Sequence, residues 1–252
     1  MAIFIAGLQA CAPVTAPREK LLPVSPEQVW ADFENTFASR PDTYFWLKSS
    51  LNYSGPNKSH RSTFELWGDS DLPLRLDLKA SLGITISLWR IGKHQVVIYS
   101  PSQEIAYTAT NSAQGLKSLG LYSPLNLQEL AALVTGQGAT VLPNVYTRSE
   151  EQEQGRIKFT FPGQSKVQTV ILDSQGRIRS LSGQNPYPWT LNVEDYEKEN
   201  TIAVPRTLRL QSAAGHTAVV RVKDIRFRSF PWPEKALSLP LPQGTTHMPL
   251  GK

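Results

Sequence analysis

The sequence is poor in the residues and patterns that support covalent or metal chemistry. Cys11 is the only cysteine among 252 residues, so an internal disulfide is excluded. The sequence contains no HExxH zinc pattern, no GxSxG nucleophile elbow and no glycine-rich phosphate or dinucleotide loop. The histidines are widely separated, which favours surface roles for His60, His94, His216 and His247. We therefore expect no enzyme activity, no metal site and no cofactor.

Long hydrophobic runs and clustered charge are also missing. Beyond Cys11, no apolar stretch approaches the roughly 20 residues that a membrane-spanning helix needs. The formal net charge is +5, but the Lys and Arg residues are spread along the chain instead of forming a basic patch. This distribution argues against a nucleic-acid partner and fits a mild preference for anionic lipid headgroups.

The single cysteine lies behind a short apolar run. Residues 1–8 read MAIFIAGL, which is typical of the end of a signal peptide and too short to cross a bilayer. Residues 8–11, LQAC, resemble a bacterial lipobox, in which the cysteine is acylated and becomes the new N-terminus. Ala12 stands where many lipoproteins carry an inner-membrane retention aspartate, so the resemblance implies an outer-membrane anchor facing the periplasm. The alternative is an N-terminal tail with an incidental free thiol.

A helix is predicted to follow a proline-containing tether at residues 12–24. Ser25 is a suitable N-cap, Pro26 fits the first helical position, and Gln28 completes a pattern close to a capping box. Apolar residues then recur at helical spacing, at Val29, Trp30, Phe33 and Phe37. Such a stripe needs an apolar surface to cover.

From residue 45 onward, apolar residues recur at every second position, as in strands with one buried face. The clearest case is LPLRLDLKA, residues 72–80, in which leucines alternate with proline or charged residues. Short breaks at Gly83 and Gly92 join this segment to the next two, which indicates an antiparallel meander. The sequence predicts about eleven strands in two runs.

A helical interruption separates the two runs of strands. Residues 115–136 predict a short helix up to Gly120, then a second helix capped by Asn126, with Glu129 three residues later, and closed by Gly136. The apolar stripe of the second helix consists of Leu127, Leu130, Leu133 and Val134. It is predicted to be a lid whose apolar stripe faces the sheet; the alternative is an ordinary structural helix.

Two segments lack apolar alternation. Residues 148–156, RSEEQEQGR, have no apolar side chain and are predicted to be an exposed turn or loop. The last 23 residues, 230–252, contain five prolines and are predicted to be an irregular tail laid along the body. The predicted organisation is therefore a signal remnant, lipidated cysteine and tether (1–24), a folded body (25–229) and a proline-rich tail (230–252). A sheet with one apolar face and few helices favours a barrel with room for a ligand.

Three blocks resemble the LolA/LolB lipoprotein localisation family. They are LPLRLDLKASLGITISLW (72–89), LGLYSPLNLQELAALVTG (119–136) and YPWTLNVEDYEKENTIAVPRTLRLQSAAGHTAVVRVKDIRF (187–227). None is a catalytic signature; the resemblance rests on their order and spacing. It implies an incomplete antiparallel β-barrel whose helical lid encloses an apolar cavity. Candidate cavity residues are Trp30, Phe33, Phe64, Leu74, Leu76, Ile86, Ile98, Leu130 and Leu133.

The loop between two of these strands contains an unusual leucine. Ser81, Leu82 and Gly83 must form the turn, and a turn tip is usually polar. Leu82 therefore either folds back onto the core or meets an apolar partner outside. The family resemblance implies the second role, because the family has a functional leucine in the matching loop, where it is thought to touch the bilayer. Leu82 and Gly83 are thus the predicted membrane-insertion loop.

The resemblance implies an anchored receptor that accepts acyl chains of lipoproteins, or other lipids, from a soluble LolA-like periplasmic carrier. The receptor would then help to insert that cargo into the outer membrane. We expect a monomer. The alternative, from another class, is an anchored interaction or envelope-assembly lipoprotein whose barrel is filled by its own aromatic residues and whose tail binds a partner.

Overall fold

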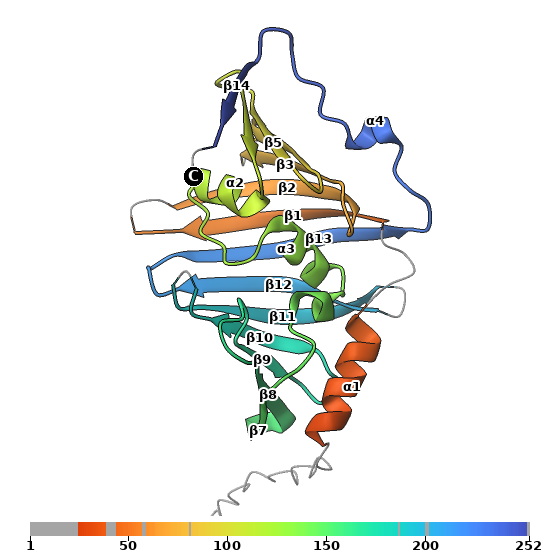
Figure 1. Ribbon diagram of the computed structural model, residues 1–252. Coiled ribbons are helices and arrows are strands. Elements are labelled where there is room, and N and C mark those ends of the chain that lie inside the picture. Colours follow the sequence, from red (N-terminus) through yellow and green to blue (C-terminus); the bar gives the residue numbers. More distant parts are fainter. Residues whose placement is uncertain are drawn as a thin grey trace, which may run out of the picture.

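The alternating segments belong to one sheet of fourteen strands in the computed structural model, which describes residues 25–38, 44–56, 59–80, 82–185, 187–199 and 202–250 (Figure 1). The first run comprises β1 (Tyr44–Ser54), β2 (Ser59–Asp69), β3 (Leu74–Ala80), β4 (Thr85–Ile91), β5 (Val96–Ser100) and β6 (Ile105–Ala109). The second comprises β7 (Arg148–Gln152), β8 (Arg156–Thr160), β9 (Thr169–Leu172), β10 (Ile178–Gly183), β11 (Trp189–Glu199), β12 (Ile202–Ser212) and β13 (Thr217–Arg228). A last strand, β14 (Thr246–Pro249), follows the tail.

Within the described residues, three of the four α-helices begin at a side-chain cap. In α1 (Pro26–Phe37) the Ser25 side chain accepts a hydrogen bond from the Gln28 amide, as its sequence predicts. The other helices are α2 (Ser112–Ser118), α3 (Leu127–Val134) and α4 (Glu234–Leu237), with two 3-10 turns, η1 (Gly138–Val141) and η2 (Glu153–Gly155). None of the helices in the described ranges is long and apolar enough to span a membrane.

The sheet is open. Its strand order is β14-β6-β5-β4-β3-β2-β1-β13-β12-β11-β10-β9-β8-β7, and β14 pairs in parallel with β6 whereas the other pairings are antiparallel. Within the described residues, the edge strands β14 and β7 do not pair with each other. The predicted fold class, a mainly β incomplete barrel with helices, is confirmed, although fourteen strands replace the expected number of about eleven.

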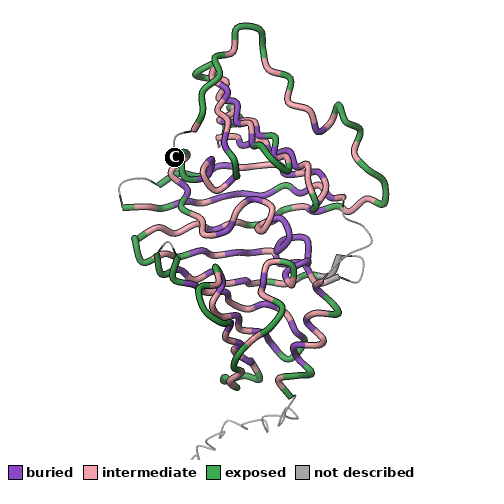
Figure 2. Tube along the Cα trace, viewed as in Figure 1, coloured by how far each residue is buried: buried purple, intermediate pink, exposed green. Residues whose placement is uncertain are grey.

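The core lies on one face of this sheet. On β1, Phe45, Leu47 and Leu51 are buried, and the register sets Leu47 between Leu66 of β2 and Ile225 of β13. Apolar residues of neighbouring strands thus meet in rows across the sheet. Buried and less buried residues alternate along the strands in Figure 2, and α1, α2 and α3 lie over the buried face in Figure 1.

The two edge strands come from segments without apolar alternation. The prediction of a turn or loop at residues 148–156 is wrong, because β7 pairs with β8 from Arg148 to Gln152 and only η2 turns the chain. An edge strand with charged side chains on a solvated border needs no apolar face, and its charges discourage pairing with another chain.

The tail is more ordered than its prolines suggest. The Trp67 indole Nε1 donates a hydrogen bond of 3.0 Å to the carbonyl oxygen of Ala236, and Leu237 is buried. β14 then pairs with β6, and the Leu250 amide donates to the Thr108 carbonyl at 2.7 Å. The prediction of a tail along the body is therefore refined: it contributes α4 and an edge strand of the sheet.

Candidate functional site

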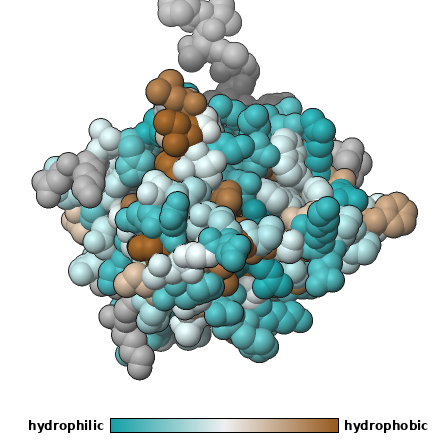
Figure 3. Space-filling model, turned by 90° about the horizontal axis from the view of Figure 1, so that it is seen from above, coloured by the Kyte–Doolittle hydropathy of each residue, from teal (hydrophilic) through white to brown (hydrophobic). Residues whose placement is uncertain are grey.

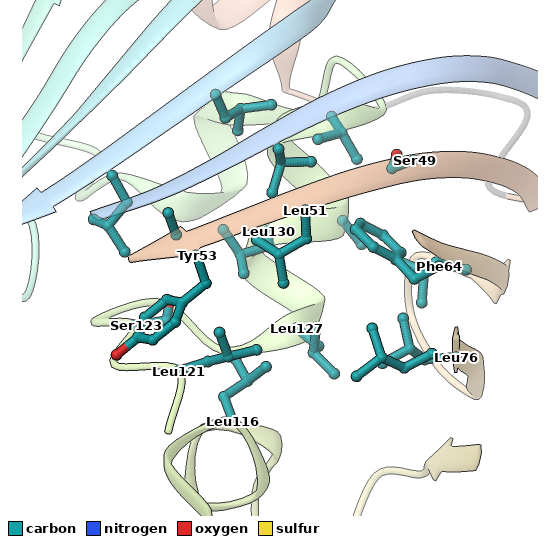
Figure 4. Close-up of a pocket in the computed structure, with 18 of the residues that line it drawn as sticks. Ser49, Leu51, Tyr53, Phe64, Leu76, Leu116, Leu121, Ser123, Leu127 and Leu130 are labelled. Atoms are coloured by element: carbon teal, nitrogen blue, oxygen red, sulfur yellow. The ribbon is translucent and has the colours of Figure 1, made fainter. Parts of the chain in front are cut away.

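The main candidate site is an apolar cavity between the sheet and the helices α2 and α3 (Figure 4). It has a volume of about 110 Å³. In Figure 4, Leu51 of β1 and Leu121 and Leu127 of the helical region surround the same space. Its wall consists of Leu47, Ser49, Leu51, Tyr53, Phe64, Leu66, Leu76, Leu78, Trp89, Leu116, Leu119, Leu121, Tyr122, Ser123, Leu127, Leu130, Ala131, Val134, Leu191, Leu208, Leu210, Ala218 and Val220.

This wall contains no ionisable group apart from the two tyrosine phenols. The lining residues on β1 run from Leu47 to Tyr53, which is about 20 Å of antiparallel strand. An elongated wall of alkyl and aromatic groups has the chemistry to hold a hydrocarbon chain and offers no charged catalytic group.

Helix α3 covers the cavity as the predicted lid would, and its sequence defines both of its ends. Asn126 accepts a hydrogen bond from the Glu129 amide at 2.9 Å, and the Glu129 carboxylate accepts one from the Asn126 amide at 2.7 Å, which is a complete capping box. Gly136 follows the helix with a positive φ of 79°, which suits glycine. The face toward the cavity carries Leu127, Leu130, Ala131 and Val134, the spacing of a single helical stripe.

Polar contacts tie the lid to its surroundings at both ends. Glu129 forms an ion pair with Lys166 of the β8–β9 connection. The Gln128 side chain donates to the Ser70 carbonyl at 3.2 Å, and the Gln137 side chain donates to the Ser70 hydroxyl at 3.3 Å. These are few and mostly neutral contacts. These polar contacts, each with a small net contribution of about 1 kcal/mol, add to the apolar packing of the buried side chains of α3.

A cluster of three rings lies at one end of the cavity. Tyr53 Oη and His216 Nδ1 share a hydrogen bond of 2.5 Å, and the His216 ring stacks on Tyr122 with centroids 4.4 Å apart. Burial of the phenol raises the pKa of Tyr53, and the neighbouring Tyr122 adds to the rise. The Tyr53 phenol therefore stays neutral at physiological pH.

A second cavity of about 560 Å³ adjoins the first at this cluster. It shares Tyr122 and Ser123 with the apolar cavity. Unlike the first cavity, it has a mixed wall, made of Asn111, Ala113, Gln114, Lys117, Tyr122, Ser123, Pro124, Tyr187, Trp189, Ser212, Ala214 and His216.

Two serine side chains, Ser49 and Ser123, interrupt the apolar wall of the first cavity. Ser49 is fully buried on β1, and its Oγ has no hydrogen-bond partner. An unpaired buried hydroxyl costs stability, on the order of 1–3 kcal/mol. The unpaired Ser49 hydroxyl therefore lowers the stability of the fold at the cavity wall.

The structure brings three of the predicted cavity residues to the wall: Phe64, Leu76 and Leu130. Trp30 and Phe33 lie elsewhere: Trp30 contacts Tyr146 and Phe159, with ring centroids 5.2 Å and 5.1 Å apart. The other four predicted residues, Leu74, Ile86, Ile98 and Leu133, are also outside the lining. Ile86 is on the outer side of β4, since Ser87 and Trp89 are the buried neighbours on that strand.

Sequence reasoning missed much of the wall, including Leu191, Leu208, Leu210 and Val220 on the second run of strands. The alternation of apolar residues showed that these side chains share a buried face. It could not show that they reach the cavity, because this depends on the pairing of β1 with β13, two strands far apart in the sequence. The cluster of Tyr53, Tyr122 and His216 had no sequence signal at all. His216 was predicted to have a surface role, whereas it bonds to Tyr53 beside the cavity.

The predicted insertion loop is exposed. Leu82 is 89% exposed and Ile84 is 66% exposed, so the alternative in which Leu82 folds back onto the core is wrong. Gly83 has a positive φ of 81° and its amide donates to the Ala80 carbonyl at 2.9 Å, which closes the turn. In the view of Figure 3 most of the surface is hydrophilic, with only a few hydrophobic projections. Cys11 lies outside the described residues.

No protein-family model and no curated protein matches this sequence. Solved structures do match the fold. A LolA superfamily protein from Nitrosomonas europaea aligns with a TM-score of 0.56 and 11% identity, covering 86% of this chain and 98% of its own. An outer membrane lipoprotein-sorting protein domain, so described, from Vibrio parahaemolyticus aligns with a TM-score of 0.53 and 10% identity, covering 83% and 94%.

A DUF1329 family protein from Desulfovibrio piger aligns with a TM-score of 0.56 and 8% identity, covering 83% of this chain and 96% of its own. At identities this low the likeness concerns the fold and carries no activity across. The chain therefore has the open, helix-covered sheet of LolA-superfamily and lipoprotein-sorting structures.

Proposed function

We propose that this protein is a lipoprotein, anchored in the outer membrane through Cys11, that binds acyl chains of other lipoproteins or of lipids in its apolar cavity. It then helps to insert this cargo into the outer membrane, after receiving it from a soluble periplasmic carrier with a LolA-like fold. The observation that supports the proposal most is the cavity itself, an elongated apolar space beneath a capped helix. The fold likeness and the lipobox-like LQAC segment are consistent with it.

The energetics of such binding need no catalytic residue. Each methylene transferred from water to an apolar wall contributes about 0.8 kcal/mol. The volume of about 110 Å³ is smaller than an engineered apolar cavity of about 150 Å³ that takes benzene. A long acyl chain therefore requires the cavity to widen, and we expect this to loosen contacts of α3 such as Glu129–Lys166 and Gln128–Ser70.

Delivery requires a contact with the membrane, and the loop of Leu82 and Gly83 is suited to it. Its leucine is almost fully in solvent, at the tip of the β3–β4 connection, where it can enter the apolar edge of a bilayer without unfolding the sheet. We assign this loop to delivery and the cavity to binding.

The experiment uses the full chain with Cys11→Ala, which removes the anchor and leaves the cavity untouched. We expect saturable uptake of a fluorescent fatty acid, uptake of a lipoprotein released from its carrier, and transfer of that lipoprotein to vesicles. Cell fractionation of the same variant should show loss of membrane attachment. Cys11→Ala protein still found in the membrane pellet would contradict the anchor, and failure to take up either ligand would contradict the binding function.

A second candidate function is an anchored interaction protein with a filled interior. The observation in its favour is the region under α1, where Trp30, Phe33 and Phe159 fill the space beside the sheet. Absence of fatty acid and lipoprotein uptake, together with a stable fold, would favour this function over lipid binding.

A further inference from the structure

The two cavities differ in chemistry and meet at one place. The inner cavity is walled almost entirely by alkyl and aromatic groups, whereas the outer cavity adds amides, hydroxyls, a histidine and a lysine to its apolar and aromatic groups. Tyr122 and Ser123 belong to both walls. A molecule that extends through this junction would have one apolar part and one polar part.

The junction has a defined geometry. Tyr53, which lines the inner cavity, is hydrogen-bonded to His216, which lines the outer one, and Tyr122 stacks on the His216 ring. Gly55 lies so close that a Cβ there would come within 2.8 Å of His216 Nδ1 and 2.9 Å of the Tyr53 hydroxyl. The three rings therefore lie together where the two cavities meet, and we refer to them as the Tyr53–Tyr122–His216 collar.

The charge on the wall of the outer cavity has only one sign, which is positive. Its wall includes the cation Lys117, and no Asp or Glu. The amides of Asn111 and Gln114 and the hydroxyl of Ser123 also belong to residues of this wall, and such groups can donate hydrogen bonds. The wall thus favours a group that accepts hydrogen bonds and is negatively charged, and disfavours a cation.

We propose that the outer cavity is a head-group site, so that an amphiphile binds with its acyl chain in the inner cavity and its polar head in the outer one. The head is an anionic hydrogen-bond acceptor such as a carboxylate, with the Tyr53–Tyr122–His216 collar around the junction of chain and head. This inference rests on the proposed lipid-binding function, which it makes specific by adding a preference for the sign of the head.

The test compares ligands that share one chain and differ in the head. The full chain with Cys11→Ala is titrated calorimetrically with dodecanoate, dodecanol and dodecyltrimethylammonium below their micelle concentrations. We expect dodecanoate to bind tightest and the ammonium ligand at least about tenfold more weakly, as one nearby charge allows. Lys117→Glu should remove or reverse this preference while leaving dodecanol binding unchanged.

Lys93→Glu is the matched control, because Lys93 is an exposed lysine of the β4–β5 turn and lies outside the outer cavity. It makes the same change in net charge and should leave the preference intact. Equal binding of all three ligands by the Cys11→Ala chain would overturn the head-group site and leave the lipid-binding function standing. Failure of all three to bind would overturn the lipid-binding function itself. Equal effects of Lys117→Glu and Lys93→Glu would mean that net charge, not the outer cavity, sets the preference.

Discussion

The region under α1 and the region under α3 are covered by helices on the same face of one sheet, yet one is full and the other hollow. Under α1, Trp30 packs in a cluster with Phe33, Phe159 and Phe161, with ring centroids 5.1–5.8 Å apart. Under α3, the helix presents leucines, an alanine and a valine to a wall of mostly aliphatic residues, and a cavity remains. Large aromatic side chains fill one region and shorter ones leave space in the other.

The two helices also differ in how they are attached to the sheet. The backbone of Phe33 in α1 lies so near the sheet that a Cβ on Gly176 would come within 2.9 Å of the Phe33 amide. Helix α3 also buries apolar side chains, and an ion pair and a few hydrogen bonds add to this packing. We expect α3, and not α1, to shift when the cavity widens, because α3 lines the cavity and α1 does not.

The largest expected effect is in the filled region. Trp30→Ala removes the centre of the aromatic cluster and should lower the free energy of unfolding by about 3–5 kcal/mol, as for large core truncations. Chemical denaturation of the Cys11→Ala chain with and without this change measures the loss. The fraction that remains folded should still take up fatty acid. A stability loss below about 1 kcal/mol would mean that the cluster is not a packed core.

Two neighbouring alanines of α3 sharpen the comparison. Ala131 lines the cavity, whereas Ala132 is buried outside the lining. Ala131→Leu should fill the cavity, keep stability and lower fatty-acid affinity at least about tenfold, since the added methylenes occupy the space of the ligand. Ala132→Leu should overpack its site and cost about 1–3 kcal/mol. The same results for both variants would contradict the assignment of the hollow region.

Substitutions of one exposed apolar residue in each of two loops are expected to differ only in their effect on the delivery of cargo to membranes. Leu82, in the turn between β3 and β4, two strands that line the cavity, and Val145, next to Tyr146 of the filled region, are both exposed, at 89% and 70%. Leu82→Glu and Val145→Glu should each change stability by less than about 0.5 kcal/mol. Only Leu82→Glu should impair transfer of cargo to vesicles, with uptake intact. Normal transfer by Leu82→Glu, or unfolding, would remove Leu82 from the mechanism.

The smallest expected effect concerns the unpaired hydroxyls. Ser49 lines the cavity, and Ser62, also buried with an unpaired Oγ, does not. Ser49→Ala and Ser62→Ala should each raise the free energy of unfolding by about 1 kcal/mol. A small gain in fatty-acid affinity is expected for Ser49→Ala alone. A lower affinity in that variant would show instead that the Ser49 hydroxyl bonds to the ligand.

Local features of the fold were predictable from the sequence because their causes are local. Ser25 and Asn126 cap their helices as predicted, since a cap needs only a side chain and an amide three residues later. The edge strands β7 and β14 were not predictable from apolar alternation, because a strand at a solvated border does not need it. The side of the sheet on which Ile86 lies was also mispredicted. The register between β3 and β4 shifts between Leu78, which pairs with Ser87, and Lys79, which pairs with Thr85, so Ile86 has no partner on β3.

The kind of site was easier to predict from the sequence than the residues that line it. An apolar cavity under the helix of Leu130 was expected, and Leu130 does line one. The sequence placed Trp30 in that cavity because an aromatic stripe at helical spacing needs an apolar surface, and it cannot say which part of a sheet the helix will cover. That choice depends on the strand order, which brings β7 to β10 under α1.

Photocross-linking tests the central claim, that the region under α3 holds acyl chains, most directly. A fatty acid with a photoreactive group at the methyl end of its chain is bound to the full chain with Cys11→Ala, irradiated, and the attachment sites are mapped by mass spectrometry. The account predicts attachment to lining residues of β1, β2 and α3, such as Leu51, Phe64 and Leu127, and its loss in Ala131→Leu. Attachment to Trp30 or Phe159 under α1, or to the outer surface of the sheet, would contradict it.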